Sequence, residues 1–229
     1  MKRFWKDVGV SEVAGGFSVT LDGCALKTQG NRAQVVPLRP LAEALAAEWA
    51  AQGETIDPSG FVLRDLADRA IDMIAEDRKT TIASLLRYAE TDTLCYRAEV
   101  DEPLHARQLE LWEPLLLAAE ARWDVHFERI SGVIHRPQAP ATLARLKAVL
   151  EAKDTFALSA LATLTPLSAS LMVGLAALEQ GADARQLWTA AELEEDWQAE
   201  LWGRDEEAEA RRAKRFAAFV AAMDFAKLA

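Results

Sequence analysis

The chain has 229 residues, of which 51% are apolar and 27% are charged, and its formal net charge is −10. This apolar share is sufficient for a buried core, whereas an acidic surface repels nucleic acid and anionic membranes. The bulk numbers therefore indicate a globular protein that is neither a nucleic-acid binder nor a membrane-surface protein.

The sequence carries no targeting or membrane signal that we can identify. The start, MKRFWKDVG, lacks the apolar run of a secretory signal, and the most apolar window, Leu167 to Leu178, is too short to span a bilayer. Two distant cysteines, Cys24 and Cys95, fit reduced thiols better than a disulfide. We therefore expect a cytoplasmic protein with no stable membrane insertion.

The first forty residues alternate between apolar and polar side chains. Phe17, Val19 and Leu21 share one side of an extended segment, and Asp22-Gly23 follows where a tight turn would return the chain. An Asp-Gly pair between alternating runs is a strong hairpin signal. The pattern predicts a small antiparallel sheet.

From Pro40 onward the apolar period changes to that of a helix, first with Leu41, Leu45 and Trp49. We predict an α+β fold, in which a small N-terminal domain with an antiparallel sheet is followed by a larger all-α helical domain. The predicted domains are residues 1–58 and 59–229.

Several local signals divide the helical part. Pro114 should kink or restart a helix that contains Trp112, and Thr165-Pro166 is typical of a helix start. Gly181 is typical of a helix end, and two more helices are expected over roughly 182–202 and 205–226.

Four acids recur at helical spacing in the second predicted helix: Asp65, Asp68, Asp72 and Glu76. This spacing predicts a solvated helix face, and the alternative is a site for a hard cation. The histidines and cysteines show no zinc spacing, and the chain has no phosphate-binding glycine loop. We expect no metal and no cofactor.

The segment YAETDTLCYRAE has the composition of a catalytic site, with Cys95 as a possible nucleophile. Nothing in the sequence supplies a base for this thiol, and its neighbours Leu94 and Tyr96 favour burial. We expect Asp92 to cap a helix and Arg97 to be structural. The alternative is a thiol-dependent small-molecule hydrolase or transferase that uses Cys95.

Glu194 interrupts an apolar stripe near the C-terminus that includes Leu187, Trp197 and Leu201. A carboxylate on an apolar face is costly unless it is paired or lies at an edge. Two interpretations remain open. Glu194 either pairs with an internal arginine or lies on the rim, or it is a recognition residue on a partner-binding surface.

Several strings occur together in one order: KRFWK, FSVTLDG, AEWAAQ, TIDP, TDTLCYRA and LEEDWQAELWG. In this combination the chain resembles a bacterial member of the Atp12 family, the assembly chaperones of the F1 sector of ATP synthase. The resemblance implies a protein that is not an enzyme. It also implies that the protein binds the unassembled F1-ATPase α subunit and prevents its aggregation.

The resemblance also suggests which residues bind the partner. In LEEDWQAELWG these are Glu194, Glu195, Gln198 and Trp202, and in AEWAAQ they are Glu48, Trp49 and Gln52. Cys24 and Gln29 depart from the family pattern in the N-terminal hairpin. We expect a monomer.

Overall fold

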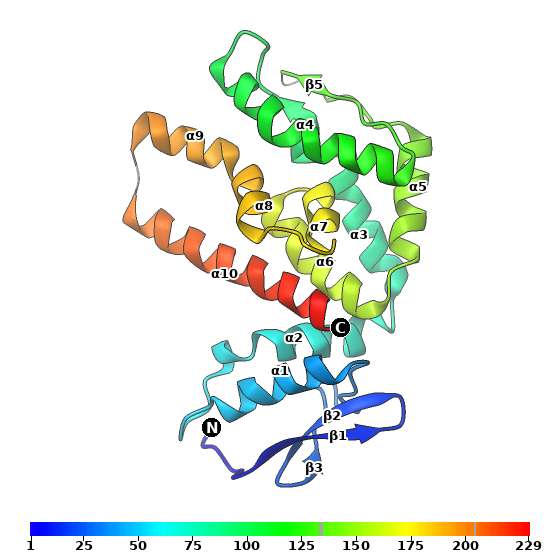
Figure 1. The fold of residues 1–229 in the computed structure, drawn as a ribbon, viewed down its shortest axis with the longest axis vertical. Coiled ribbons are helices and arrows are strands. Elements are labelled where there is room, and N and C mark those ends of the chain that lie inside the picture. Colours follow the sequence, from blue (N-terminus) through cyan, green and yellow to red (C-terminus); the bar gives the residue numbers. More distant parts are fainter. Residues whose placement is uncertain (133–134, 204) are drawn as a thin grey trace. The chain divides into compact units, whose positions relative to one another are not determined.

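The computed structural model describes residues 1–132, 135–203 and 205–229 (Figure 1). The strands are β1 (Val8–Val13), β2 (Gly16–Leu21), β3 (Cys24–Ala25), β4 (Tyr96–Arg97) and β5 (Ile130–Ser131). The helices are α1 (Arg39–Ala50), α2 (Val62–Arg69), α3 (Arg78–Glu90), α4 (Pro103–Trp123), α5 (Pro140–Glu151), α6 (Thr155–Ser168), α7 (Leu171–Ala177), α8 (Ala184–Ala191), α9 (Leu193–Trp202) and α10 (Glu206–Leu228). Short 3₁₀ turns occur at Pro58–Gly60 and Thr93–Cys95, and a π-helical turn, Ala70–Ile74, follows α2.

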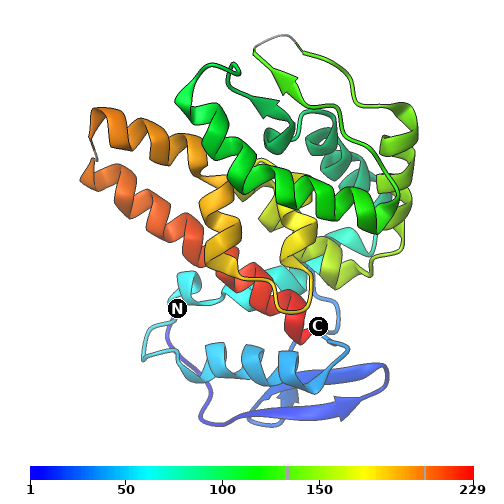
Figure 2. The same cartoon turned by 45° about the horizontal axis from the view of Figure 1, so that its top comes forward.

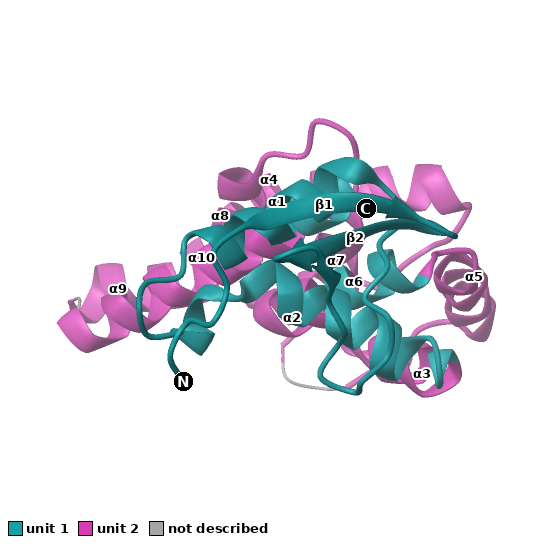
Figure 3. Cartoon of the chain, turned by 90° about the horizontal axis from the view of Figure 1, so that it is seen from below, with its two compact units in different colours: residues 1–78, 155–160, 224–229 teal, residues 79–154, 161–223 magenta. Residues whose placement is uncertain are grey.

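The chain forms two compact units, which Figure 3 distinguishes by colour. Unit 1 consists of residues 1–78, 155–160 and 224–229, and unit 2 of residues 79–154 and 161–223. The predicted α+β class, with a small antiparallel sheet before a mostly helical part, is confirmed. The predicted domain boundary after residue 58 stays a prediction.

Unit 1 is built on the three-stranded antiparallel sheet β1-β2-β3, against which α1 packs. Leu21 pairs with Cys24, so that Asp22 and Gly23 form a two-residue turn with φ values of 49° and 81°. These positive values suit the turn type that joins twisted antiparallel strands. The predicted hairpin is confirmed, and its apolar residues Val19 and Leu21 are buried.

Two short segments from later in the chain complete the core of unit 1. Phe225 near the C-terminus is fully buried and its ring lies 6.1 Å from that of Phe156 at the start of α6. On the same helix, the Ser159 hydroxyl donates to the carbonyl of Leu66 at 2.7 Å.

The four acids of the second helix form the predicted solvated face only in part, since Asp65 and Glu76 are exposed but Asp68 and Asp72 bind backbone groups. Asp68 is buried and accepts hydrogen bonds from the Gln29 amide N–H at 3.1 Å and from Gln34 Nε2 at 2.6 Å. Asp72 accepts from the Thr28 hydroxyl at 2.6 Å and from the Gly30 amide at 2.8 Å. For these two carboxylates the prediction was wrong, because they bind the loop after β3. Across the described ranges, no group of three or more His, Cys, Asp or Glu side chains is arranged to hold a metal ion.

The helix boundaries in the second half of the chain differ from the predicted ones. Pro166 lies inside the last turn of α6 rather than at a helix start, and α7 begins after Ser170, whose hydroxyl accepts from the Val173 amide at 3.0 Å. Helix α4 continues through Pro114. The helix expected over 182–202 is divided at Glu192 into α8 and α9, whereas the last helix is confirmed as α10.

Unit 2 also contains a feature that the sequence did not suggest, a two-stranded parallel pairing of β4 with β5. Two residues per strand are too few for a periodic signal. A charge network connects β4 and the residue before β5 to helix α4: Arg97 pairs with Glu113, and Arg129 pairs with both Glu113 and Glu120.

Within the described residues, no helix has the length and apolarity needed to cross a bilayer.

Candidate functional site: helix α9 and its surroundings

Cys95 has the surroundings of a structural residue. Its side chain is fully buried, and burial raises the pKa of the thiol far above its usual value. A thiol that does not ionise is not an effective nucleophile. The environment therefore does not favour the alternative in which Cys95 is catalytic.

Asp92 is the cap that its position predicts. It accepts from the Leu94 amide at 3.1 Å, from the Ser170 hydroxyl at 2.6 Å and from the Met172 amide at 3.1 Å. Burial raises its pKa to about 6. Arg97 is the expected structural residue, since its guanidinium is buried and paired with Glu113.

Helix α9 carries four of the predicted partner-binding residues. It lies with the first turns of α10 at one edge of unit 2 (Figures 1 and 2), contacts α4 through the Arg107–Glu200 pair, and has only Leu193 buried. Leu201 is 57% exposed and Trp202 is 76% exposed. Because Glu194, Glu195 and Gln198 are also exposed, the predicted residues form one accessible surface, which we call the α9 surface.

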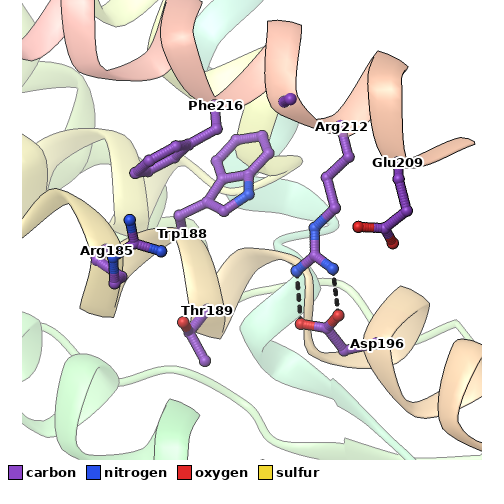
Figure 4. A pocket seen from close by; sticks show the side chains of 8 residues that line it. Arg185, Trp188, Thr189, Asp196, Glu209, Arg212 and Phe216 are labelled. Atoms are coloured by element: carbon purple, nitrogen blue, oxygen red, sulfur yellow. Dashed lines mark hydrogen bonds and ion pairs between the residues drawn. The ribbon is translucent and has the colours of Figure 1, made fainter. Parts of the chain in front are cut away.

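Ion pairs with α10 hold α9 in place (Figure 4). The Arg212 guanidinium binds both carboxylate oxygens of Asp196, and Arg215 lies 3.1 Å from Glu192 and 3.5 Å from Glu195. Glu192 is buried at the junction of α8 and α9, and burial raises its pKa to about 7. These ion pairs connect α9 and the residue before it to α10.

A pocket of about 330 Å³ lies next to the Arg212–Asp196 pair. Figure 4 shows the side chains that line it. Its walls include the aromatic rings of Trp188 and Phe216, and Arg185 lies 5.3 Å from the Phe216 ring centre. The lining contains two arginines, Arg185 and Arg212, and two acids, Asp196 and Glu209. Because these charges cancel, the pocket favours neither cations nor anions.

Of the two interpretations that the sequence left open for Glu194, pairing with an internal arginine is not observed among the described residues, whereas a position on the rim and a recognition role stay predictions. Instead, Gln108 Nε2 donates to Glu194 Oε1 at 2.9 Å. Gln108 is fully buried, and its own carbonyl accepts from the Ala98 amide at 2.8 Å. Desolvation raises the pKa of Glu194. Its carboxylate lines two hollows, of about 410 Å³ and 290 Å³.

The predicted residues of the AEWAAQ string have contacts within unit 1. Glu48 accepts from the amides of Leu63 at 2.7 Å and Arg64 at 2.9 Å, and thereby caps the start of α2. Gln52 is buried and its side-chain carbonyl accepts from the Asp57 amide at 2.7 Å. These bonds are structural, and a partner-binding role for Glu48 and Gln52 stays a prediction.

Trp49 lies in an aromatic cluster, with ring centres 5.0 Å from Trp5 and 4.5 Å from Phe61. Its packing fits the structural interpretation of its helix stripe, and its role as a partner anchor also stays a prediction. No pattern in the sequence marks Gln108 or Arg212 as parts of the α9 surroundings, because their partners lie 86 and 16 positions away.

Comparisons with known proteins agree with this architecture. The family model described as "ATP12 chaperone protein" matches residues 2–120. "Protein atp12, mitochondrial" from Schizosaccharomyces pombe is 26% identical over 219 residues, which are 90% of this chain and 75% of that protein. The crystal structure of Atp12 from Paracoccus denitrificans is 39% identical, with a TM-score of 0.94, and the match covers 99% of this chain and 97% of that one. A variant of the Paracoccus protein with an aspartate replaced by lysine matches equally well.

Proposed function

Because this chain belongs to the ATP12 chaperone family, we propose that it binds the unassembled α subunit of F1-ATPase and prevents its aggregation during ATP synthase assembly. In this proposal it acts as a monomer in the bacterial cytoplasm, with no catalytic step and no cofactor.

The observation that carries the proposal is the α9 surface. Trp202 and Leu201 are large apolar side chains exposed on a helix at one edge of unit 2, next to the carboxylates Glu194 and Glu195. Tryptophan is enriched at the centres of protein interfaces, and exposed apolar groups framed by polar ones mark docking surfaces. The α9 surface therefore fits a protein client.

The chemistry of such a client agrees with this surface. An unassembled subunit of an obligate complex exposes an apolar interface that promotes aggregation. Trp202 would cover part of that interface, and the acids would attract basic groups at its edge. A small surface of this mixed character binds reversibly, as release to the next assembly step requires.

The test is light scattering of isolated α subunit, diluted from denaturant in the presence of the purified chain. The wild-type protein should suppress scattering, and Trp202→Ala and Glu194→Lys should suppress it less. Glu90→Lys is the matched control, since Glu90 is exposed at the end of α3, outside the α9 surface. If the wild-type protein neither binds α nor changes its scattering, the proposed function is wrong.

If the wild-type protein protects α and all three variants protect it equally, the client binds elsewhere. Circular dichroism and thermal melts of each variant would first establish that the substitutions leave the fold intact. Trp202 is three-quarters exposed, so its removal should cost little stability.

A further inference from the structure

A groove of about 410 Å³ lies between α9, β4 and the turn that leads into α4. We call it the α4–α9 groove. Two aromatic side chains and three carboxylates define its lining: Tyr96, Trp197, Glu99, Glu102 and Glu194. A groove that combines flat aromatic walls with negative charge is suited to a cation that has an extended planar face.

The negative charge of the groove has no internal counterpart. Over the part of the chain that the structure describes, Glu99, Glu102 and Glu194 form no ion pair. The one cation in the lining, Arg97, is buried and paired with Glu113 on the side of α4. A ligand that brings positive charge would therefore meet carboxylates that nothing else neutralises.

One of the three carboxylates, that of Glu194, is held in place before any ligand arrives. Buried Gln108 fixes Oε1 of Glu194, and Oε2 accepts no hydrogen bond among the described residues. Glu99 lies directly over Gly132, where a Cβ would come within 2.5 Å of Glu99 Oε1. Two features therefore favour glycine at position 132: the φ of +82°, which other residues rarely adopt, and the nearness of the Glu99 carboxylate. Preorganised acceptors lose little conformational entropy on binding.

The Trp197 ring already makes a cation–π contact with an arginine of this chain. The guanidinium of Arg107 lies 4.6 Å from the centre of that ring, and it is held there by Glu200 at 2.8 Å. An arginine of α4 thus already lies between an aromatic ring and a glutamate of α9.

The α4–α9 groove offers similar elements, with Trp197 and Tyr96 as rings and Glu194 as the carboxylate. The Tyr96 ring also stacks with His135, with ring centres 6.3 Å apart, and the one arginine of the lining, Arg97, is already paired with Glu113.

We propose that the α4–α9 groove binds an arginine side chain presented by the protein client. The guanidinium would donate to Glu194 and stack against an aromatic wall, with Glu99 and Glu102 adding attraction. Arginine fits better than lysine because its planar group stacks on rings and pairs with two carboxylate oxygens at once. The identity of the client rests on the proposed function, whereas the preference for arginine rests on the groove alone.

The first experiment uses no client. N-acetyl-arginine amide is titrated into ¹⁵N-labelled protein at low ionic strength, and the indole N–H signal of Trp197, assigned with Trp197→Phe, is followed. N-acetyl-citrulline amide is the comparison, since it has nearly the same shape and no charge. Arginine amide should shift the Trp197 signal saturably, and citrulline amide should not.

Two variants make the result specific. Glu194→Gln should weaken arginine-amide binding by about tenfold, since it removes the charge of the anchored carboxylate. Asp101→Asn removes the same charge between Glu99 and Glu102 at an exposed position outside the lining, and it should leave binding unchanged. The inference is overturned if citrulline amide shifts Trp197 equally, if arginine amide causes no saturable shift, or if Asp101→Asn weakens binding as much as Glu194→Gln.

A second measurement separates this inference from the proposed function. If isolated α subunit binds the wild-type protein but arginine amide does not shift Trp197, the groove inference fails and the chaperone function stands. If arginine amide binds as expected but α subunit does not, the groove inference stands and the proposed client is wrong.

Discussion

Gln108 and Glu194 are joined by a hydrogen bond of 2.9 Å, although they lie 86 positions apart in the chain. The amide is fully buried in α4, and the carboxylate lies on the accessible side of α9. This bond connects the interior of unit 2 to the surface that we propose for the client.

Gln108→Leu should destabilise unit 2 by about 1–3 kcal/mol, because it leaves the Ala98 amide and one oxygen of Glu194 without their partner. Urea unfolding followed by tryptophan fluorescence measures the change. Gln198→Leu on the exposed side of α9 is the control, and it should change the free energy of unfolding by no more than about 0.5 kcal/mol. Equal effects of the two substitutions would show that the buried amide has no special role.

The ion pairs that attach α9 to α10 should control how readily α9 opens. Asp196→Asn removes the charge that binds Arg212, and we expect amide hydrogen exchange in α9 to accelerate by roughly tenfold, or about 1.4 kcal/mol of local opening free energy. Glu207→Gln breaks only the exposed pair with Arg211 and should leave exchange in α9 unchanged. Unaltered exchange in Asp196→Asn would mean that packing, rather than charge, holds the helix.

The buried carboxyl of Asp92 should give the protein a specific dependence on pH. Burial raises its folded-state pKa from 3.8 to about 6, so the folded protein binds this proton more tightly than the unfolded chain does. The contribution of Asp92 to stability therefore rises as the pH falls from about 6 to about 4, by up to about 3 kcal/mol.

Asp92→Asn cannot gain this proton. The stability advantage of the wild-type protein over the variant should therefore widen between pH 6 and pH 4, as measured by urea unfolding at each pH. An advantage that stays constant, or that narrows toward acid pH, would show that the folded-state pKa of Asp92 is not raised.

The two cysteines should differ sharply in reactivity. Cys24 is exposed at the hairpin, whereas Cys95 is buried with its pKa raised. Intact-mass spectrometry after iodoacetamide treatment should show one modification in the native protein and two in denaturant. Cys95→Ala should retain protection of the client. Rapid alkylation of Cys95 in the native protein would reopen the thiol-enzyme alternative.

The accuracy of the sequence-based predictions depended on the distance between interacting residues. The hairpin at Asp22-Gly23 was predictable because the turn and both strands lie within a few positions of one another. Asp68 and Asp72 were misassigned to a solvated face because the loop that they bind lies about forty positions earlier. A helical spacing of acids is the same whether the partner is water or backbone amides.

The candidate site shows the same limit. Glu194 could be identified as unusual from its place in an apolar stripe, but Gln108, which explains its position, could not. The Thr165-Pro166 pair was misleading for a related reason. Pro166 lies inside α6, which continues to Ser168 although a proline there removes one helical hydrogen bond, and the positive φ of 49° at Ala169 follows the helix end.

The last six residues of the chain, 224–229, belong to unit 1, together with residues 155–160. Phe225 fills a fully buried position there, against Phe156. The aromatic core of the N-terminal sheet unit therefore cannot be completed until Phe225 has left the ribosome. Until then, a nascent form of this chaperone would itself expose the kind of apolar surface that chaperones cover.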